Sequence, residues 1–422
     1  MTLEEIRTYH KILILGYATE GRASERFLKK YHPSAEIGIA DQKDDENYLD
    51  EQKHYDLAIR TPLLRPKKVT IPYTTGTRLF FGNTSHKTIG ITGTKGKSTT
   101  VSLLYHIMSH SGLKVGLYGN IGTPMIDILT DEIDSETICI LELSNYQLED
   151  CEYSPTIACF LNIYEETHNH DSFDEYFQAK TNITTHQSSS DVFLYNGSFP
   201  LIAELSAQTH AQTQDFQTFD IESILKDVEL PFATHMDNIR AVWAICSYFN
   251  ISQEDFVTHI QTYRPLQYRL ENIGTHDGID FYNDSASIHP SSTLFALQTI
   301  PHVDTLIVGG DDRGYDMHEL AEDLSTRHIP HIVCMGETGR MLLDVCSKEY
   351  QMKSKFFQTD SLLEAVEYAY THARRGSACL LSSGAPSYGL FENLVERGEL
   401  FTTYVKNYAQ KKKNHKHTTS AS

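Results

Sequence analysis

A glycine-rich stretch between a β-rich run and a helical pattern is the first part of the sequence that could do chemistry. It reads GITGTKGKSTT, from Gly90 to Thr100. In a strand–loop–helix of this kind, backbone N–H groups and the helix N-terminus face an anion such as phosphate. Lys97 would reach the β- and γ-phosphates of a nucleotide, and the hydroxyl of Ser98 or Thr99 would lie near Mg²⁺. The common phosphate-loop pattern needs a glycine where this chain has Ile91, so the spacing favours a variant loop.

A carboxylate follows the loop along the chain, at the end of another apolar run. The segment ILELSNYQLE (140–149) places Glu142 where a strand closes. A carboxylate in that position can hold Mg²⁺ against the phosphates of ATP. The alternative interpretation is that Glu142 is a solvated glutamate at a strand end. The phosphate loop upstream favours the metal ligand over this alternative.

The N-terminal part of the chain carries a weaker signal for ligand binding. The segment ILGYATEGRAS keeps Gly16 and Gly21 of a G-x-G-x-x-G pattern, with Ala18 between them. Asp41 ends a second β-rich run, where an acidic residue commonly meets a ribose or base. The alternative for this segment is a structural turn with no ligand.

Short β-rich runs alternate with helical patterns and would position these residues. This rhythm predicts an α/β protein with parallel sheets covered by helices. One sheet cannot hold every run, so we expect three domains: an N-terminal Rossmann-like domain, a central P-loop ATPase-like domain and a C-terminal Rossmann-like domain. Their expected ranges are 1–84, 85–264 and 265–410, followed by a polar, basic tail at 411–422 that we expect to be disordered.

Composition narrows the class of protein. The 422 residues carry a formal net charge of −20, which argues against non-specific binding to nucleic acid or to anionic membranes. No signal-peptide pattern is evident and no apolar run is long enough to span a bilayer. The seven cysteines form no C-x-x-C pair, so we expect a cytoplasmic, reduced protein without membrane insertion.

The glycine loop and the ILELSNYQLE segment together resemble one enzyme family. GITGTKGKSTT is similar to the G-x-T-G-T-N-G-K-[ST] loop of the Mur ligases and folylpolyglutamate synthetases, with Lys95 in place of the usual Asn. The closing segment LLSSGAPSYGLFENLVERGELF (380–401) is most like the D-glutamate-adding, MurD-type branch. Enzymes of this family join an amino acid to a carboxylate through an acyl phosphate.

The resemblance implies a set of ATP contacts. Lys97 and Arg269 would stabilise charge on the transferring phosphoryl group and, with Lys180, count as catalytic. The helix THMDNIRAVWAIC (234–246) would lie near the adenine, and NDS (283–285) would supply an aspartate that meets ATP. The implied nucleotide-binding residues are Gly93, Thr94, Lys95, Gly96, Lys97, Ser98, Thr99, Asn238, Arg269 and Asp284.

The resemblance also implies two Mg²⁺ ions as cofactors beside ATP. Their ligands would include Ser98, Glu142, a histidine and Lys180, which in the family is carbamylated by CO₂. The segment LNIYEETHNHDSFDEYFQAK (161–180) lacks one residue relative to the family pattern. His168 and His170 therefore both compete for the metal, and His168 is the first choice.

The expected substrates are UDP-MurNAc-L-Ala and D-glutamate. Residues implied to bind them are Gly16, Asp41, Asn120, Ser144 and Ser387, the last of which would hold a carboxylate of D-glutamate. Ala286 replaces a family lysine that lies near the incoming amino acid, and this leaves the amino acid open.

The resemblance implies an ATP-dependent amide-bond ligase of cytoplasmic peptidoglycan-precursor synthesis, which we expect to be a monomer. Two alternatives remain at this point. One is a related Mur or folylpolyglutamate-type ligase with another amino acid or acceptor. The other is a nucleotide-binding protein that kept the fold and lost turnover, which the irregular histidine segment would support.

Overall fold

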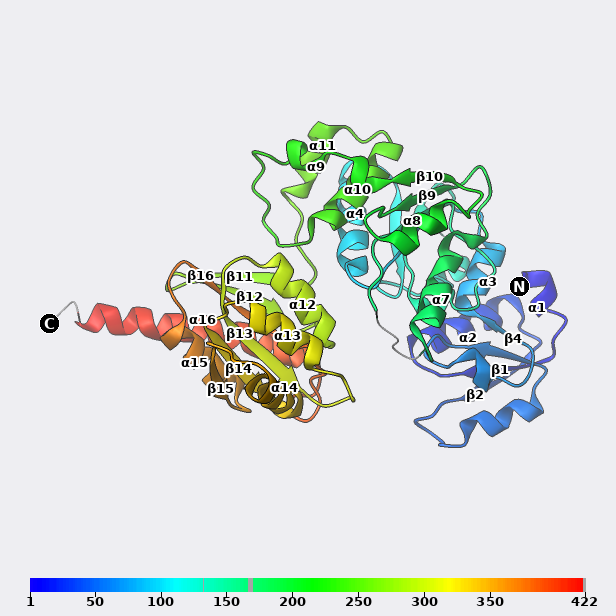
Figure 1. Ribbon diagram of the computed structural model, residues 1–422. Coiled ribbons are helices and arrows are strands. Elements are labelled where there is room, and N and C mark those ends of the chain that lie inside the picture. Colours follow the sequence, from blue (N-terminus) through cyan, green and yellow to red (C-terminus); the bar gives the residue numbers. More distant parts are fainter. Residues whose placement is uncertain (132, 166–169, 420–422) are drawn as a thin grey trace. The chain divides into compact units, whose positions relative to one another are not determined.

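The chain divides into two compact units in the computed structural model (Figure 1), which describes residues 1–131, 133–165 and 170–419, with side chains up to residue 412. The first unit comprises Met1–Glu229 and Met236–Tyr263, and the second comprises Leu230–His235 and the chain from Arg264 onward. Two sheets belong to the first unit and one to the second. The predicted α/β class with parallel sheets is confirmed.

The first sheet has four parallel strands in the order β2-β1-β3-β4. Apolar side chains of β1 pack on both faces of the sheet, which explains why its sequence, KILIL, is almost continuously apolar. The elements of this region are α1 (Leu3–Ile6), β1 (Lys11–Leu15), α2 (Thr19–Tyr31), β2 (Glu36–Ala40), η1 (Tyr48–His54), β3 (Leu57–Arg60), η2 (Pro66–Lys68), β4 (Tyr73–Thr75) and α3 (Gly76–Asn83).

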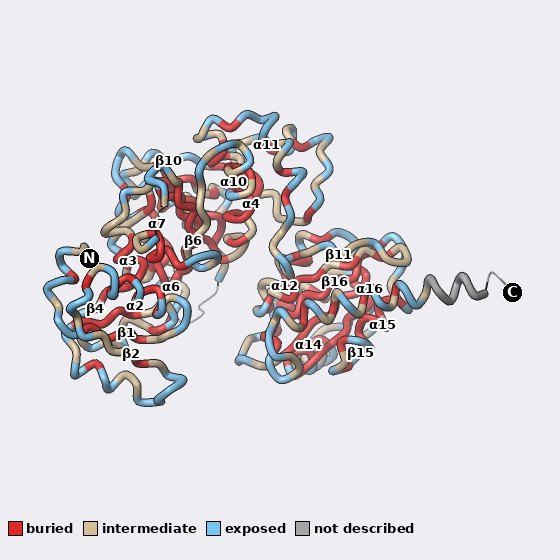
Figure 2. Tube along the Cα trace, turned by 180° about the vertical axis from the view of Figure 1, so that it is seen from behind, coloured by how far each residue is buried: buried red, intermediate tan, exposed pale blue. Residues whose placement is uncertain are grey.

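The second sheet has six parallel strands in the order β10-β9-β8-β5-β7-β6. Its central strands are fully buried, as the buried stretches in Figure 2 show. The elements are β5 (Thr88–Thr92), α4 (Lys97–His110), β6 (Val115–Gly119), α5 (Asp127–Thr130), β7 (Ile138–Glu142), α6 (Asn145–Leu148), β8 (Ile157–Phe160), α7 (Phe173–Thr185), β9 (Val192–Tyr195), α8 (Pro200–Ser206), β10 (Gln212–Asp215), η3 (Phe216–Thr218), α9 (Ile221–Ile224), α10 (Met236–Tyr248) and α11 (Gln253–Ile260).

The third sheet has the strand order β11-β12-β16-β13-β14-β15. All its pairs are parallel except β11 with β12, which form an antiparallel hairpin. The elements are β11 (Glu271–His276), β12 (Ile279–Asp284), α12 (Pro290–Thr299), β13 (Val303–Gly310), α13 (His318–Thr326), β14 (His331–Met335), α14 (Gly336–Glu349), β15 (Lys355–Gln358), α15 (Leu362–His372), β16 (Ser377–Ser382) and α16 (Leu394–Thr419).

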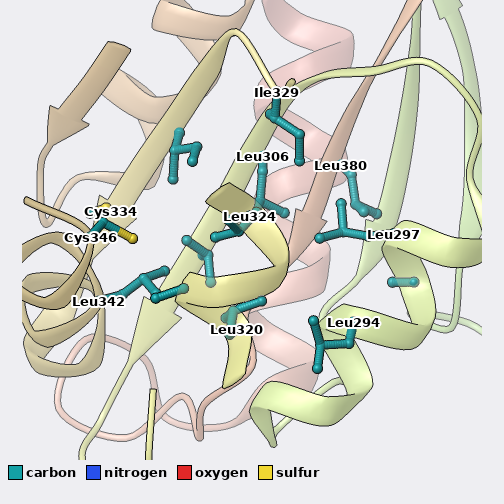
Figure 3. Close-up of a cluster of buried hydrophobic side chains, with 14 of the residues drawn as sticks. Leu294, Leu297, Leu306, Leu320, Leu324, Ile329, Cys334, Leu342, Cys346 and Leu380 are labelled. Carbon is teal, nitrogen blue, oxygen red and sulfur yellow. The ribbon is translucent and has the colours of Figure 1, made fainter. Parts of the chain in front are cut away.

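Helices cover both faces of the third sheet. One face packs against α12, α13 and α14 through the leucine-rich cluster that Figure 3 shows, in which Leu294, Leu320 and Leu342 represent the three helices. The other face packs against α15 and α16 through residues such as Phe281 and Phe401. The carboxyl ends of β12, β13 and β16 meet at one edge of this sheet, which is where ligands bind in open α/β sheets.

Helix α16 differs from the sequence expectation at the end of the chain. It continues to Thr419 and so includes residues 411–419, for which the sequence predicts a disordered tail. Phe401, Val405 and Ala409 are buried along the helix, and the glutamine and lysines that follow are good helix formers, so the helix extends beyond its packed part. Among the described residues, no helix is long and apolar enough to cross a membrane.

Candidate active site

The glycine loop connects β5 to α4, as the sequence predicts. Gly96 is the residue before the first helical turn and has a left-handed backbone with φ +83°. A Cβ atom at Gly96 would lie 2.3 Å from the Oδ1 atom of Asn238, in the first turn of α10. Glycine is therefore required here by both the backbone and the neighbour. The loop and Asn238, which lie far apart in the sequence, are side by side.

The side chain of Asn162 clamps the backbone of Lys95. Its Oδ1 atom accepts a hydrogen bond from the Lys95 N–H at 2.9 Å, and its Nδ2 atom donates to the Lys95 carbonyl at 3.0 Å. The hydroxyl of Thr94 accepts hydrogen bonds from the backbone N–H of Tyr164 and from the hydroxyl of Tyr176, both at 3.1 Å. The loop is thus held by the side chain of Asn162 and the backbone of Tyr164, which follow β8, and by the side chain of Tyr176 on α7.

Two lysines converge on one carbonyl of the loop. The Nζ atom of Lys97 donates to the Gly93 carbonyl at 2.8 Å and to the Thr94 carbonyl at 3.1 Å. The Nζ atom of Lys180 donates to the same Gly93 carbonyl at 3.0 Å and lies 4.8 Å from the ring centre of Tyr176. Lys180 is fully buried, although its helix α7 has solvated residues on its other side. Ser98 and Thr99 lie in the first turn of α4, and Ser98 is buried.

Glu142 ends β7 and is buried with one carboxylate oxygen unsatisfied. Its Oε1 atom accepts a hydrogen bond from the Nδ2 atom of Asn120 at 2.9 Å, and its backbone carbonyl accepts the Asn120 N–H at 3.0 Å. Its Oε2 atom has no hydrogen-bond partner among the described residues. A buried carboxylate oxygen without a partner is costly unless a cation binds it, so the residue fits a Mg²⁺ ligand.

The described residues provide no ready-made metal cage. Within residues 1–131, 133–165 and 170–412, no group of three or more His, Cys, Asp or Glu side chains is placed to hold a metal ion by itself. An ion at Glu142 would take its other oxygens from the nucleotide, hydroxyl groups and water, which is the usual coordination of Mg²⁺ in phosphate-transfer sites.

The two competing histidines differ in what the structure reveals. His168 lies outside the described residues. The side chain of His170 is buried, and its Nε2 atom accepts a hydrogen bond from the Nδ2 atom of Asn145 at 2.9 Å. Its Nδ1 atom lies 3.8 Å from the Oε1 atom of Glu149, and its ring stacks on that of Tyr146. His170 therefore packs against α6, directly after the segment that carries Glu142.

Asp41 closes the loop between β1 and α2. Its carboxylate accepts the backbone N–H of Tyr17 at 2.5 Å and that of Lys43 at 2.9 Å, and these bonds, that from Lys43 first, lower the pKa of Asp41. Gly16 has φ +92°, and a Cβ atom there would lie 2.2 Å from the hydroxyl of Thr61. Gly16 and Asp41 are thus brought together at the carboxyl ends of β1 and β2.

A contact that the sequence did not reveal joins this loop to the central sheet. Glu20, in the first turn of α2, accepts a hydrogen bond from the Nε2 atom of Gln147 at 3.2 Å. Gln147 also forms the capping box of α6 with Ser144, whose backbone N–H and hydroxyl both donate to its Oε1 atom. Burial raises the pKa of Glu20 to about 7. Ser144 and the β1–α2 loop are therefore linked through one glutamine.

The second unit carries the other predicted residues. Asp284 ends β12 and accepts hydrogen bonds from the Leu270 N–H at 3.2 Å, the Ser382 hydroxyl at 2.8 Å and the hydroxyl of Ser287. Burial raises the pKa of Asp284 to about 6. Arg269 is exposed beside Leu270.

Ser387 is buried in the segment between β16 and α16. Its carbonyl accepts the N–H of Phe391 at 3.0 Å. The structure thus brings Ser387 and Asp284 to the carboxyl edge of the same sheet, since Asp284 is the last residue of β12 and Ser387 follows β16.

Comparison with known proteins decides the family. Residues 91–261 match the Mur ligase middle domain. The chain is 30% identical over 342 residues to the UDP-N-acetylmuramoylalanine–D-glutamate ligase of Clostridioides difficile, covering 76% of this chain and 75% of that protein. It belongs to the Mur ligase family. The protein of the same name from Lactobacillus acidophilus is 28% identical over 459 residues, which cover 96% of this chain and 99% of the relative.

Solved structures agree on the fold. MurF from Acinetobacter baumannii has a TM-score of 0.62 at 17% identity, covering 96% of this chain and 97% of that one. MurF from Thermotoga maritima, solved in complex with ADP, has a TM-score of 0.61 at 13% identity, covering 96% of each chain. This Mur ligase is an ATP-dependent ligase of peptidoglycan-precursor synthesis, as the motifs predict.

Proposed function

We propose that the enzyme adds D-glutamate to UDP-N-acetylmuramoyl-L-alanine through an acyl-phosphate intermediate. The observation that carries the proposal is the cluster around the Gly93 carbonyl, where Lys97 and Lys180 converge. The names of the relatives from C. difficile and L. acidophilus support the choice of D-glutamate and of the UDP-linked acceptor.

In this proposal the phosphate loop (residues 93–99) holds the phosphates of ATP. Its backbone N–H groups and the N-terminus of α4 face the anion, and Asn238, whose side chain lies beside Gly96, is proposed to contact the nucleotide. On ATP binding, Lys97 exchanges its carbonyl partners for phosphate oxygens. Arg269 and Asp284, which belong to the second unit, are also proposed to contact ATP.

Two Mg²⁺ ions, when bound, shield the repulsion between the ATP phosphates and the substrate carboxylate. We propose that Glu142 supplies its unsatisfied Oε2 atom and Ser98 its hydroxyl, and that His168 and a carbamylated Lys180 complete the ligands. Carbamylation requires the ammonium of Lys180 to lose one proton; the neutral amine then bonds to CO₂ and releases a second proton, which converts a buried cation into an anion. His170 remains the alternative histidine.

The reaction then follows in two steps. The carboxylate of the UDP-linked substrate attacks the γ-phosphorus of ATP, ADP leaves, and an acyl phosphate forms. The amine of D-glutamate attacks the acyl carbon, phosphate leaves and the amine loses a proton. Gly16, Asp41, Asn120 and Ser144 are proposed to bind the UDP-linked substrate, and Ser387 a carboxylate of D-glutamate. We further propose that the enzyme acts as a cytoplasmic monomer on small molecules.

A second candidate is a related ligase for another amino acid, which Ala286 favours because the family lysine is absent there. One assay separates the two: phosphate release with ATP, Mg²⁺, UDP-MurNAc-L-Ala and either D-glutamate, L-glutamate, L-lysine or D-alanine. The proposal requires faster phosphate release with D-glutamate than with any of the other three amino acids. Release with a different amino acid and none with D-glutamate would replace it with the second candidate.

The role of Lys180 has its own test. Lys180→Ala should abolish ligation because the carbamate ligand is lost, whereas Lys114→Ala, which removes an exposed lysine from the same unit, should not. The measurement is phosphate release with and without added bicarbonate, together with the melting temperature of each variant. Full activity of folded Lys180→Ala without bicarbonate would contradict the carbamate role.

A further inference from the structure

Glu20, in the first turn of α2, is a carboxylate that lies against two other helices. Its Oε1 atom accepts a hydrogen bond from the Nε2 atom of Gln147 on α6 at 3.2 Å. A Cβ atom at Gly76, the first residue of α3, would lie 3.2 Å from its Oε2 atom, so α3 begins with a residue that leaves room for the carboxylate. Glu20 thus joins the helix that follows the β1–α2 loop to the helix that follows β7.

This position is unfavourable for an ionised carboxylate. Burial is the main cause that raises the pKa of Glu20 to about 7; the hydrogen bond from Gln147 opposes the rise, and the negative charge of Asp127 adds to it. Asp127 is itself paired with Arg26 of α2 at 2.6 Å. Because the pKa of Glu20 is higher in the folded protein than its ordinary value of 4.5, folding stability falls as the pH rises from about 4.5 through about 7. A residue that costs stability at its position indicates a role in function.

Gln147 transmits the contact from Glu20 to the turn between β7 and α6. The backbone N–H and the hydroxyl of Ser144 donate to its Oε1 atom at 3.0 and 3.1 Å, while its Nε2 atom donates to Glu20. Both atoms belong to one planar amide, whose oxygen only accepts and whose nitrogen only donates. Turning this amide by half a rotation would place its NH₂ group against the N–H of Ser144. Because an ionised carboxylate only accepts hydrogen bonds, Glu20 fixes the orientation in which Gln147 holds Ser144.

Ser144 depends on this amide more than the nearby Glu142 does. Glu142 is the last residue of β7, and Leu143 after it is still held by the strand beside it. The Leu143 N–H donates to the Ile91 carbonyl at 3.0 Å, and the Leu143 carbonyl accepts the hydroxyl of Thr92 at 2.8 Å. The N–H and the hydroxyl of Ser144 bond to Gln147 instead of to a strand. Loss of the contact at Glu20 should therefore disturb Ser144 and leave Glu142 in place.

We propose that Glu20 is a positioning residue for the UDP-linked substrate, because it fixes the amide of Gln147 that orients Ser144. This rests on the proposed function, in which Ser144 binds that substrate. Glu20 acts through Gln147 and is not a catalytic residue. The phosphate loop lies outside this set of contacts, because the segment after β8 and helix α7 hold it. Binding of the UDP-linked substrate should therefore depend on Glu20, and binding of ATP should not.

Two substitutions of similar volume separate the hydrogen-bond acceptor of Glu20 from the rest of its side chain. Glu20→Gln keeps an oxygen that accepts the hydrogen bond from Gln147, whereas Glu20→Met removes every acceptor. A hydrogen bond to a charged group contributes enough to change a binding constant by roughly tenfold, so Glu20→Met should weaken binding of UDP-MurNAc-L-Ala and raise its KM by about that factor. Glu20→Gln should stay within about threefold of wild type, and kcat and the KM for ATP within about twofold in both variants.

The experiment measures UDP-MurNAc-L-Ala binding by isothermal titration calorimetry, steady-state phosphate release and the melting temperature, at a pH above the pKa of Glu20. The variants are Glu20→Met, Glu20→Gln and the control Glu36→Met. Glu36 is an exposed glutamate at the start of β2 that pairs with Lys11, so its variant has the same chemical change away from the β7–α6 turn. Weaker binding in Glu20→Met alone supports the proposal. Because Glu20→Met also removes a buried carboxylate, its melting temperature should not fall with the binding.

Three results would overturn the proposal. Unchanged binding in Glu20→Met would show that the contact has no bearing on the substrate. Equal losses in Glu20→Met and Glu20→Gln would show that the acceptor is not what matters. Tighter binding in both variants would show that the charge of Glu20 opposes an anionic substrate.

A double variant tests whether Glu20 acts through Gln147. Gln147→Met should weaken binding of UDP-MurNAc-L-Ala by itself, and adding Glu20→Met to it should cause no further loss, because the two residues form one contact. A further loss of the same size as in the single Glu20→Met variant would show that Glu20 acts by another route, and the proposal would be wrong.

If Glu20→Met does not fold, Glu20→Ala takes its place, because alanine removes the acceptor and favours the helix. Failure of both variants to fold would show a structural role and overturn the proposal. A wild-type enzyme that binds UDP-MurNAc-L-Ala but releases no phosphate with D-glutamate contradicts the proposed function, while the binding comparison at Glu20 remains decisive. A wild-type enzyme that does not bind UDP-MurNAc-L-Ala overturns both.

Discussion

The clamp formed by Asn162 makes the most quantitative prediction about the nucleotide site. Asn162→Ala removes both hydrogen bonds to the backbone of Lys95 and leaves an N–H and a carbonyl of the phosphate loop without these partners. Each such bond contributes about 0.5–1.5 kcal/mol, so the loop loses about 1–3 kcal/mol of its ordering energy. ATP must then order the loop on binding, and its affinity should fall roughly 5- to 150-fold.

Asn83 offers a matched control in the first sheet region. Its Oδ1 atom accepts the Leu3 N–H at 2.7 Å, and its Nδ2 atom donates to the Met1 carbonyl at 3.2 Å and to the Leu79 carbonyl at 2.7 Å. Asn83→Ala therefore breaks a similar set of backbone contacts away from the phosphate loop. It should lower the melting temperature and leave ATP affinity unchanged.

The assay is isothermal titration calorimetry with ATP and Mg²⁺, paired with thermal melting of both variants. The account requires Asn162→Ala to weaken ATP binding at least about fivefold more than Asn83→Ala does. Equal ATP affinities in the two variants, with equal losses of melting temperature, would refute the idea that Asn162 orders the loop for the nucleotide.

Two further predictions concern Gly96 and Asp284. Gly96→Ala should weaken ATP binding at least about tenfold, since a methyl group would displace Asn238. The control is Gly112→Ala, because Gly112 has the same φ of +83° but no neighbouring atom at the position of the methyl group. This control should lose only about 1–2 kcal/mol of folding stability through backbone strain. Equal ATP affinities in these variants would exclude the Asn238 contact as the cause. The pKa of Asp284 is raised from 3.8 to about 6, so its favourable contribution to stability is complete below pH 3.8 and is lost as the pH rises through 6. Asp284→Asn should therefore gain up to about 3 kcal/mol relative to wild type at pH 7.5, and less at pH 5, in urea unfolding; a difference that does not depend on pH would contradict this.

The sequence predicted the fold class and the local context of the phosphate loop because both depend on short-range patterns. Apolar runs such as KILIL and the strand before Gly93 are buried on both faces, and such runs are visible without knowing their neighbours. Helix α4, which begins at Lys97 directly after Gly96, has apolar residues at helical spacing. These features are confirmed because they are encoded within about twenty residues of each other.

Contacts between distant segments could not be predicted from one sequence. Nothing in the spacing shows that Asn162 clamps Lys95, that Gln147 reaches Glu20, or that Arg397 is buried. Each depends on how segments that are distant in the sequence pack against one another. The expectation of a disordered tail differs from the structure for another reason. Helix α16 is packed up to Ala409, and it continues into residues that have no apolar periodicity of their own.

The most direct test of the acyl-phosphate mechanism follows one oxygen atom. UDP-MurNAc-L-Ala labelled with ¹⁸O at both oxygens of its carboxylate is incubated with enzyme, ATP, Mg²⁺ and D-glutamate, and the released phosphate is examined by mass spectrometry. Because the attacking carboxylate oxygen becomes the bridging oxygen of the acyl phosphate, the account predicts one ¹⁸O atom in each phosphate formed with product. Phosphate released without ¹⁸O, while the amide product accumulates, would contradict the central claim.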